Sequence, residues 1–403
     1  MKIATDLKRL VLDRIRLEDV IGLSQALIRI PSETGHERQV SEFLQSKMRD
    51  MSLDVQAVEA EPGRPNALGL WRGTGEGPTV MFSGHMDTVG VGNLAAWRTD
   101  PFKGEVIDGK LYGRGAMDSK GGGLASILVA LRALQESGIK LRGNVLVVGT
   151  VDEEVGGRKG MQFLVRSGAI NPDMVVYCVH SDMEIKAYFK GVAWLHWHIQ
   201  GQTAHGSMPS RGVNAITRAA QIIAALDELG GLPYERHPIL GDHTINFGWI
   251  SGGGGDRRFN VVPDQCEFGM DMRLVPGQST DLVETWLRDF LEKMRESDPN
   301  LEASFEFYTR REPRSVPLDE PILQIVKQAA VEVLGREPTI GGTISTGDLT
   351  AVLDKGIPGI GFGPGDLERG NAHKENEFIE VDQLVDATKI YALTMLEACG
   401  VCD

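Results

Sequence analysis

Four short apolar runs constrain the fold of this chain more than any other feature of its sequence. They occupy residues 79–83, 144–150, 174–178 and 357–362. Runs that stay apolar at consecutive positions are typical of strands buried on both faces, as in a parallel sheet. Helical patterns, for example at residues 124–134 and 381–396, separate the runs along the chain. This alternation predicts an α/β fold with a mixed, mostly parallel sheet flanked by helices.

The middle of the chain follows a different pattern. It contains, in order, an alternating strand at 192–200, an amphipathic helix at 213–229, strands at 243–250 and 266–274, and a helix at 282–294. Alternation of apolar and polar residues is typical of half-buried antiparallel strands. A chain of 403 residues is also longer than one compact core usually needs. We therefore expect an α+β domain at residues 190–305, inserted into an α/β domain made of residues 1–189 and 306–403.

The charge and the apolar stretches of the chain exclude several classes of partner. The formal net charge is −14, and no segment concentrates enough Lys and Arg to bind nucleic acid electrostatically. Residues 1–30 alternate charged residues with Leu, Ile and Val, which predicts an amphipathic helix and not a signal peptide. No apolar stretch reaches the length of a membrane span. We expect a cytoplasmic protein with neither a nucleic-acid nor a membrane partner.

Side chains that can bind a metal follow three of the predicted buried strands. His85 and Asp87 follow the first run, Glu153 and Glu154 the second, and His180 the third. Sites of open α/β sheets form in the crevice beyond the carboxyl ends of the strands. There, His85 can ligate a metal while Asp87 accepts a hydrogen bond from its other ring nitrogen or from a neighbouring base. Each residue taken alone has an ordinary structural explanation, so the argument depends on their convergence.

The glycine-rich segment at residues 113–123 raises the question of phosphate binding. It lacks the G-K-[S/T] of a phosphate-binding loop, and Asp118 occupies the third glycine position of the dinucleotide-binding fingerprint. A carboxylate at that position would repel a phosphate. Asp118 could instead cap a helix or ligate a metal. The glycines on both sides indicate that something approaches the backbone closely.

Together these residues predict a centre that holds two divalent metal ions. The predicted ligands are His85, Asp118, Glu154, His180 and His373. Imidazole and carboxylate ligands, with an aspartate able to bridge, suit a pair of Zn²⁺ ions, or Co²⁺ or Mn²⁺. Two such ions about 3.5–4 Å apart lower the pKa of a shared water and polarise a carbonyl group. Glu153 is then the expected general base, which takes the proton of the water and passes it to the leaving nitrogen.

The order of the motifs resembles a known family. The motifs are G-H-x-D-x-V at 84–89, W-x-x-D-P-F-x-G at 97–104, G-R-G-x-x-D-x-K-G-G at 113–122, D-E-E-x-G-G at 152–157 and A-H at 372–373. This order resembles the co-catalytic metallopeptidase family of acetylornithine deacetylase, succinyl-diaminopimelate desuccinylase, aminoacylase and glutamate carboxypeptidase, over essentially the whole chain. The resemblance implies that Asp118 bridges the two metals, that Glu153 is the catalytic base and that Asp87 supports the site.

The resemblance also implies roles for the inserted segment. That segment resembles the lid of the family, which usually also forms a homodimer. His205 matches a lid histidine that stabilises the tetrahedral oxyanion, often from the partner subunit. The matched substrate-binding positions are Lys190, Asn260, Arg273, Ser345 and Thr346. Among them, Arg273 is expected to grip a carboxylate of a small-molecule substrate.

One position departs from the common family pattern. Most members have Glu-Pro, or an Asp, where this chain has Val179-His180. We assign the fifth ligand to His180, because the carbamoyl-amidohydrolase branch resembles this chain in using a histidine there. Asp182 is the alternative ligand. A neutral ligand leaves the metal pair more positive by one charge than a carboxylate would.

The resulting functional prediction is deacylation of an N-acyl amino acid, or hydrolysis of a similar small amide that bears a carboxylate. Exopeptidase action, as a dipeptidase or a carboxypeptidase, would use the same metal centre and is the main alternative. A homologue that binds metal without catalysis is a third possibility. Glu153 and His205 argue against it, because a binding protein needs neither a base nor an oxyanion donor.

Overall fold

The computed structural model describes residues 3–253, 258–343 and 347–402, and its chain divides into two compact units. Unit 1 comprises residues 1–187, 316–341 and 347–403, and unit 2 comprises residues 188–315 and 342–346. The predicted boundary at residue 305 falls inside a strand of unit 2 that runs to Arg311. More and less exposed residues continue to alternate along this strand past residue 305. Ser345 and Thr346 lie outside the described residues.

The large sheet contains the four buried strands that the sequence predicts. Its strands are β1 (Asp54–Glu59), β2 (Pro65–Trp71), β3 (Thr79–His85), β6 (Asn144–Thr150), β7 (Met174–Tyr177), β8 (Ile185–Phe189), β15 (Arg314–Ser315), β16 (Ile340–Thr343) and β17 (Gly359–Gly361). The order is β1-β2-β6-β3-β7-β17-β8-β15, and β16 pairs with β8. Strands β6, β3, β7 and β17 are parallel neighbours, which confirms the α/β fold. The outer strands add antiparallel neighbours on both sides.

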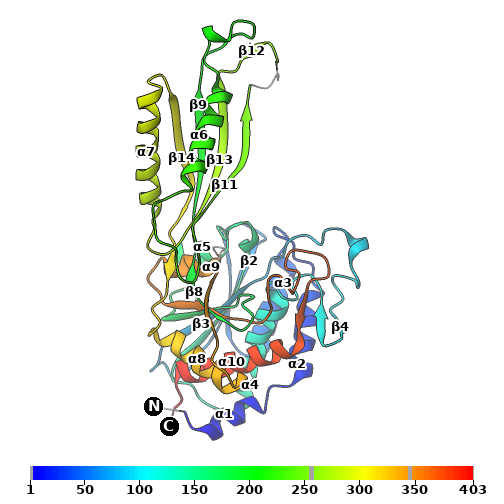
Figure 1. The fold of residues 1–403 in the computed structure, drawn as a ribbon. Helices are drawn as coiled ribbons and strands as arrows, with labels where there is room; N and C mark the ends of the chain where they lie inside the picture. Colours follow the sequence, from blue (N-terminus) through cyan, green and yellow to red (C-terminus); the bar gives the residue numbers. More distant parts are fainter. Residues whose placement is uncertain (1–2, 254–257, 344–346, 403) are drawn as a thin grey trace. The chain divides into compact units, whose positions relative to one another are not determined.

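Unit 1 also contains helices, some of which pack against its sheet and others against those helices (Figure 1). They are α1 (Thr5–Leu12), α2 (Leu17–Ile28), α3 (Arg38–Asp50), α4 (Ala125–Glu136), α5 (Met161–Arg166), α8 (Pro321–Leu334), α9 (Asp348–Leu353) and α10 (Val381–Cys399). Helix α3 contacts β1 and β2, while α10 contacts β3 and β6 and lies beside α4. A small three-stranded sheet joins β4 (Glu105–Ile107), β5 (Lys110–Tyr112) and β18 (Phe378–Glu380).

The amphipathic segment at the N-terminus is two helices, α1 and α2, and not the single helix predicted for residues 1–30. The helical hydrogen bonding stops after Ile15, and Arg16 is extended. The break lets each helix pack separately, because α1 contacts α4 and α10, whereas α2 also contacts the short helix η2 (Lys120–Leu124). In the described part of the chain, no helix combines the length and the apolar character needed to cross a bilayer. The cytoplasmic location stays a prediction.

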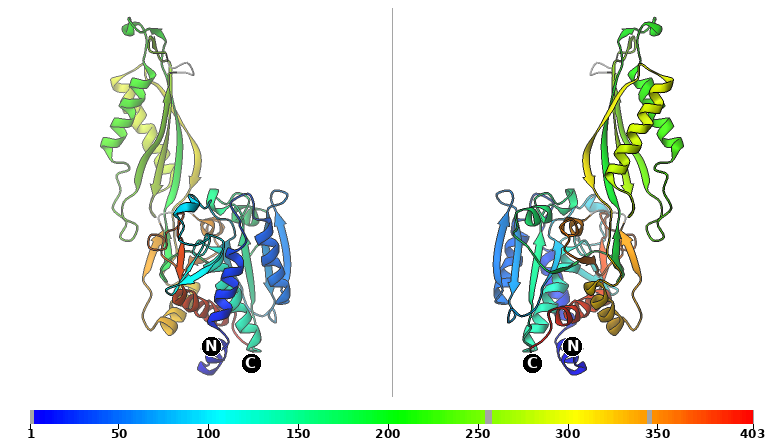
Figure 2. Two further views of the ribbon diagram at one scale, coloured as in Figure 1. Left: turned by 90° about the vertical axis from the view of Figure 1, so that its right-hand side faces the viewer. Right: turned by 90° about the vertical axis from the view of Figure 1, so that its left-hand side faces the viewer.

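Unit 2 is an α+β unit whose four-stranded antiparallel sheet has helices on one face (Figure 2). The strands are β9 (Gly191–Gln200), β11 (Thr244–Gly252), β13 (Gln265–Leu274) and β14 (Glu302–Arg311), in the order β11-β13-β9-β14, and the helices are α6 (Ala215–Leu229) and α7 (Thr280–Ser297). Alternate residues of β9, such as Leu195 and Trp197, are buried against the helices. The residues between them, including His196 and His198, lie on the opposite face.

Candidate metal centre

The five predicted ligands all lie in unit 1, and three of them come from segments at the carboxyl ends of its parallel strands. His85 is the last residue of β3. Glu154 lies in a short 3-10 helix, η3 (Glu153–Val155), which follows β6, and His180 lies just after β7. Because β6, β3 and β7 are parallel neighbours, these segments leave the sheet at one edge. Asp118 precedes η2, and His373 lies in the loop between β17 and β18.

Asp118 lies between two groups of side chains. Its Oδ1 atom is 2.8 Å from Nε2 of His85 and 3.5 Å from Nδ1 of His180. Its Oδ2 atom is 3.1 Å from Nε2 of His373, and that nitrogen is also 3.1 Å from Oε2 of Glu154. Each carboxylate oxygen therefore faces a different set of ligands. This is the arrangement that a bridging aspartate requires.

His180 provides a direct test of whether a metal fits. Its Nδ1 atom is shielded from solvent and forms no hydrogen bond with the described residues, although Oδ1 of Asp118 lies 3.5 Å away. A buried polar atom without a partner is costly, and a metal ion would satisfy it. The alternative ligand, Asp182, is engaged elsewhere: its Oδ1 atom accepts hydrogen bonds from Arg369 and, at 2.7 Å, from Gln383. The geometry favours His180 over Asp182.

The orientation of His85 also suits metal binding. Its Nδ1 atom lies 2.9 Å from the backbone oxygen of Asp87, which is placed to accept the Nδ1 proton and leave Nε2 free to act as a ligand. The carboxylate of Asp87, which the sequence analysis expected as the partner, is farther away, at 3.7 Å. It accepts instead from the backbone nitrogens of Glu153 and Glu154, at 3.1 and 3.2 Å. Asp87 therefore orients the segment that carries both glutamates.

Glu153 lies in an environment suited to proton transfer. Burial raises the pKa of Glu153 to about 8; the charge of His85 opposes the shift, and the carboxylates of Asp348 and Asp118 add to it. A carboxyl group that titrates near neutral pH can both accept and return a proton. Two bound dications would draw this pKa back down, because positive charge favours the carboxylate.

Glu377, which the sequence analysis missed, holds the segment that carries Asp118. Its Oε1 atom accepts hydrogen bonds from the backbone nitrogens of Met117 and Asp118, at 3.0 and 3.1 Å. Its Oε2 atom accepts from Gly115 and from the guanidinium of Arg114. Glu377 is buried and lies four residues after His373, so one segment carries both a candidate ligand and a support for another. A buried glutamate among such donors has no recognisable sequence pattern.

The glycines after Asp118 serve close packing of the chain against itself. A Cβ atom at Gly123 would lie 2.4 Å from the sulfur of Cys178, and one at Gly121 would lie 2.8 Å from the backbone oxygen of Gly115. The close approach predicted from the sequence is therefore made by protein atoms. Two non-glycine residues at the centre, Asp152 and His373, have positive φ angles of 70° and 61°. Such strained positions concentrate at functional sites.

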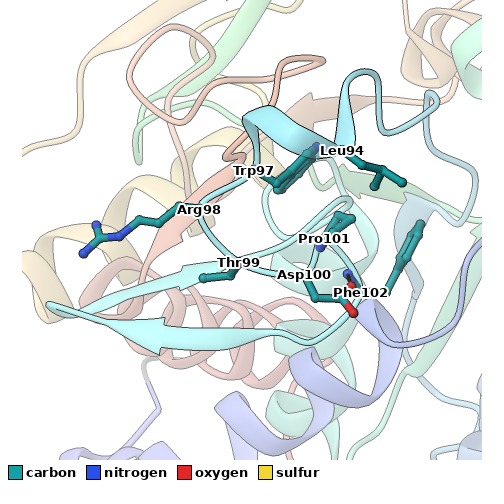
Figure 3. Close-up of a pocket in the computed structure, with 7 residues that line it drawn as sticks. All are labelled: Leu94, Trp97, Arg98, Thr99, Asp100, Pro101 and Phe102. Atoms are coloured by element: carbon teal, nitrogen blue, oxygen red, sulfur yellow. Dashed lines mark hydrogen bonds between the residues drawn. The ribbon is translucent and has the colours of Figure 1, made fainter.

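The W-x-x-D-P-F part of the second motif, residues 97–102, lines a pocket together with Leu94, and this pocket contains none of the predicted ligands (Figure 3). The indole nitrogen of Trp97 donates to the backbone oxygen of Val91 at 2.7 Å. The guanidinium of Arg114 lies over the Trp97 ring, 5.4 Å from its centroid. Arg114 in turn pairs with Glu377. This motif therefore contributes to the supports of the Asp118 segment.

The predicted lid residues lie in unit 2. His205 is exposed, with Nδ1 2.8 Å from the Ser207 hydroxyl. His205 lies on β10 (Ala204–His205), which pairs with β12 (Val261–Val262). Asn260 directly precedes β12. Lys190 donates to the backbone oxygen of Asp242 at 2.6 Å. Burial lowers the pKa of Lys190. The negative charge of Asp242 raises this pKa in part, and the positive charge of Arg273 lowers it.

The chain belongs to the peptidase family M20/M25/M40, whose sequence profile matches residues 81–397. This confirms the family resemblance and the prediction of a hydrolase that acts on amide or peptide bonds. The Escherichia coli K12 protein YgeY is 30% identical over 394 residues, which cover 93% of each chain. A Bacillus subtilis deformylase of N-formyl-4-amino-5-aminomethyl-2-methylpyrimidine is 26% identical, with 95% of each chain covered. An acetylornithine deacetylase of Photorhabdus laumondii is 28% identical over 96% of this chain and 98% of its own.

Solved structures of the same fold include peptidases. Aminopeptidase PepT of Bacillus cereus has a TM-score of 0.75 at 24% identity, covering 96% of this chain and all (100%) of its own. The Bacillus subtilis YXEP protein, described as a dinuclear metal binding peptidase from the M20 family, has a TM-score of 0.65 at 15% identity, covering 95% and 98%. These likenesses support the fold.

Proposed function

We propose that this protein is a two-metal amidohydrolase that removes the acyl group from an N-acyl amino acid or a similar small amide with a carboxylate. The observation that carries the proposal is the position of Asp118, whose two oxygens face separate sets of histidine and carboxylate side chains. One metal would be held by His85, His180 and Asp118. The other would be held by Glu154, His373 and the second oxygen of Asp118.

The donors suit zinc. Imidazole nitrogens and carboxylate oxygens without a thiolate favour Zn²⁺, with Co²⁺ or Mn²⁺ as alternatives. When bound, such a pair of ions supplies Lewis-acid polarisation of the scissile carbonyl and lowers the pKa of a water. The description of the YXEP protein as a dinuclear metal binding peptidase supports the proposal of two ions.

Glu153 would do the proton transfer of the reaction. Its carboxylate takes a proton from the attacking water and delivers it to the nitrogen of the leaving group. The C–N bond then breaks, and the nitrogen leaves as a neutral amine. Asp87 keeps Glu153 in place by accepting the hydrogen bond from its backbone nitrogen. Glu377 keeps Asp118 in place in the same manner.

Residues of unit 2 would recognise the substrate. We propose that Arg273 and Lys190 bind the substrate carboxylate, that Asn260 contacts the substrate, and that His205 stabilises the tetrahedral oxyanion. The proposal for Arg273 is supported by its charge and by its partial exposure, at 29% of the side chain. Unit 2 would also form a homodimer, since its edge strand β11 is largely exposed and exposed edge strands are templates for pairing.

A substrate screen tests the proposed reaction. The zinc-loaded protein is offered N-acetyl, N-succinyl, N-formyl and N-carbamoyl amino acids together with dipeptides and tripeptides, and the released amine is measured. We expect turnover of at least one N-acyl amino acid above that of any peptide. Preferential turnover of peptides would establish the exopeptidase alternative, which the aminopeptidase neighbour favours. Absence of all turnover with both metals bound would contradict the proposal.

A further inference from the structure

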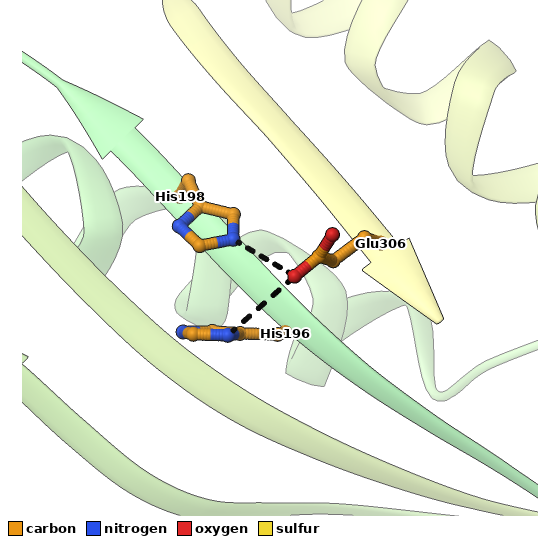
Figure 4. A group of neighbouring side chains, drawn as sticks. All are labelled: His196, His198 and Glu306. Atoms are coloured by element: carbon orange, nitrogen blue, oxygen red, sulfur yellow. Dashed lines mark ion pairs between the residues drawn. The ribbon is translucent and has the colours of Figure 1, made fainter. Parts of the chain in front are cut away.

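We propose that unit 2 carries a second, separate metal site, formed by His196 and His198 of β9 and Glu306 of β14 (Figure 4). The site shares no residue with the candidate metal centre of unit 1. It lies on the face of the sheet opposite to α6 and α7. The ligand class would be a first-row transition-metal dication, with Zn²⁺ as the expected ion.

The register of the sheet brings the three side chains together. His196 and His198 are two residues apart on one strand, so both project from the same face. Glu306 is the partner of His196 on the neighbouring strand. The two imidazole rings lie with their centroids 4.1 Å apart. Sequence spacing gives the histidine pair, but only the pairing of β9 with β14 adds the carboxylate.

The distances between the candidate ligand atoms fit one ion. Oε1 of Glu306 lies 3.6 Å from Nε2 of His198 and 4.0 Å from Nδ1 of His196. In a tetrahedral zinc site with bonds of about 2.0–2.1 Å, neighbouring ligand atoms are about 3.3 Å apart. The two distances exceed this spacing by about 0.3 and 0.7 Å, so rotations of the exposed Glu306 side chain would have to close the site. Water would complete the coordination, because the Glu306 side chain is 70% exposed.

Glu267, on the other neighbouring strand, would support both histidines. Its Oε1 atom lies 3.2 Å from Nδ1 of His198, and its Oε2 atom lies 3.3 Å from Nε2 of His196. These are the ring nitrogens that do not face Glu306. A histidine ligand usually donates its other ring N–H to a carboxylate, which fixes the tautomer and orients the ring. Glu267 is placed to do this for two histidines at once.

The surroundings of the two histidines are acidic, because Glu267 and Glu306 flank them on the neighbouring strands. In the described part of the chain, the ion pairs of Glu267 and Glu306 involve only His196 and His198. When both histidines are neutral, the charges of the site are those of the two carboxylates, whose side chains are 48% and 70% exposed to solvent. Nε2 of His196 is shielded from solvent and forms no hydrogen bond in the structure, so the Glu267 carboxylate, 3.3 Å away, would have to realign to accept its proton. The Trp249 ring, which packs edge-on at 5.1 Å from the His196 ring, contributes to this shielding. A dication facing Glu306 would balance the charge.

Metal stoichiometry tests the proposal independently of catalysis. Wild-type protein and the variants His198→Gln and Glu306→Gln are dialysed to equilibrium against the same Zn²⁺ solution, and zinc per chain is measured. We expect each variant to bind one equivalent less than wild type. The matched control is Glu302→Gln, which removes an exposed glutamate from the same strand opposite Gln200, and it should bind as much zinc as wild type.

The result separates the site from other zinc binding. Equal zinc in wild type, His198→Gln and Glu306→Gln would overturn the proposal, as would an equal loss in Glu302→Gln, which indicates binding to surface carboxylates in general. Because all three variants change exposed or half-exposed side chains, circular dichroism should show unchanged folds. The difference between wild type and variants does not depend on how many ions the centre of unit 1 holds.

Discussion

Individual side chains of the candidate metal centre divide into ligands, a base and supports. His85, His180 and His373 approach Asp118 from different segments, while Glu153 stands beside them with its backbone held by Asp87. Because these contacts assign different tasks to neighbouring residues, single substitutions should have separable effects on metal content and on turnover.

Replacing the proposed base should remove catalysis without removing metal. In Glu153→Ala, the ligands and the hydrogen bonds to the backbone nitrogens of residues 153 and 154 are retained. Loss of general base catalysis typically costs about 10²–10⁴-fold in rate. We expect kcat to fall by that amount while metal content, measured by elemental analysis, stays at the wild-type level. A variant with near-normal kcat would show that another residue is the base.

Replacing His180 should empty one of two sites. In His180→Ala, the proposed metal site near His85 loses a terminal ligand, whereas Glu154 and His373 would still hold the other ion. We expect about one equivalent of metal less than wild type by elemental analysis. The matched control is Asp182→Ala. Because the wild-type Asp182 carboxylate pairs with Arg369, its removal should leave the metal content unchanged. If Asp182→Ala loses an equivalent and His180→Ala does not, the ligand assignment is shifted by two residues.

At the scale of elements, parallel strands deliver ligands to one edge, and loops from distant parts of the sequence complete the centre. The segment after β17 contributes most, because it supplies both His373 and Glu377. This segment contacts the Asp118 segment, which is far away in the sequence. For example, Met117 donates a hydrogen bond to Glu377, and the two residues are 260 positions apart.

Replacing Glu377 should therefore weaken metal binding although it is no ligand. Glu377→Gln keeps the shape of the side chain but replaces one accepting oxygen with an NH2 group. That group would face backbone and guanidinium groups that are themselves donors. Changes to such supports typically cost about 10–100-fold in metal affinity or activity. We expect a loss of that size in a metal-competition titration. The exposed Glu368→Gln on the same loop should behave like wild type.

At the scale of the whole molecule, the two units have separate tasks. Unit 1 contains the candidate metal centre, and unit 2 contains the proposed substrate-binding residues together with an exposed edge strand, β11. On that strand, Ile250 is 53% exposed. An exposed apolar edge of this kind is unusual unless another chain covers it.

The proposed homodimer follows from this edge. Sedimentation at micromolar concentration should show a dimer, and Ile250→Lys should shift it toward the monomer, because a lysine on an edge strand discourages pairing. The control Leu318→Lys changes an exposed leucine of unit 1, at 48% exposure, and should leave the dimer intact. A wild-type monomer would contradict the proposal. A wild-type dimer that Ile250→Lys does not weaken would place the interface on another surface.

The sequence by itself determined the elements whose pattern is local. Apolar runs predicted β3, β6, β7 and β17, because a strand buried on both faces is apolar at most positions. Alternation of apolar and polar residues predicted β9, and strand patterns also predicted β11 and β13. Motif order identified the family, and the positions of the motifs at strand ends identified the candidate ligands. These properties depend on neighbours within a few residues.

Only the tertiary structure decided which distant side chains meet. The support by Glu377, the contacts of Asp118 with His180 and His373, and the pairing of Glu306 with two histidines all depend on contacts between segments far apart in the sequence. Local periodicity does not encode such contacts, since strand register and loop packing are set by the whole core. The break between α1 and α2 has the same origin, because each helix follows its own packing partners.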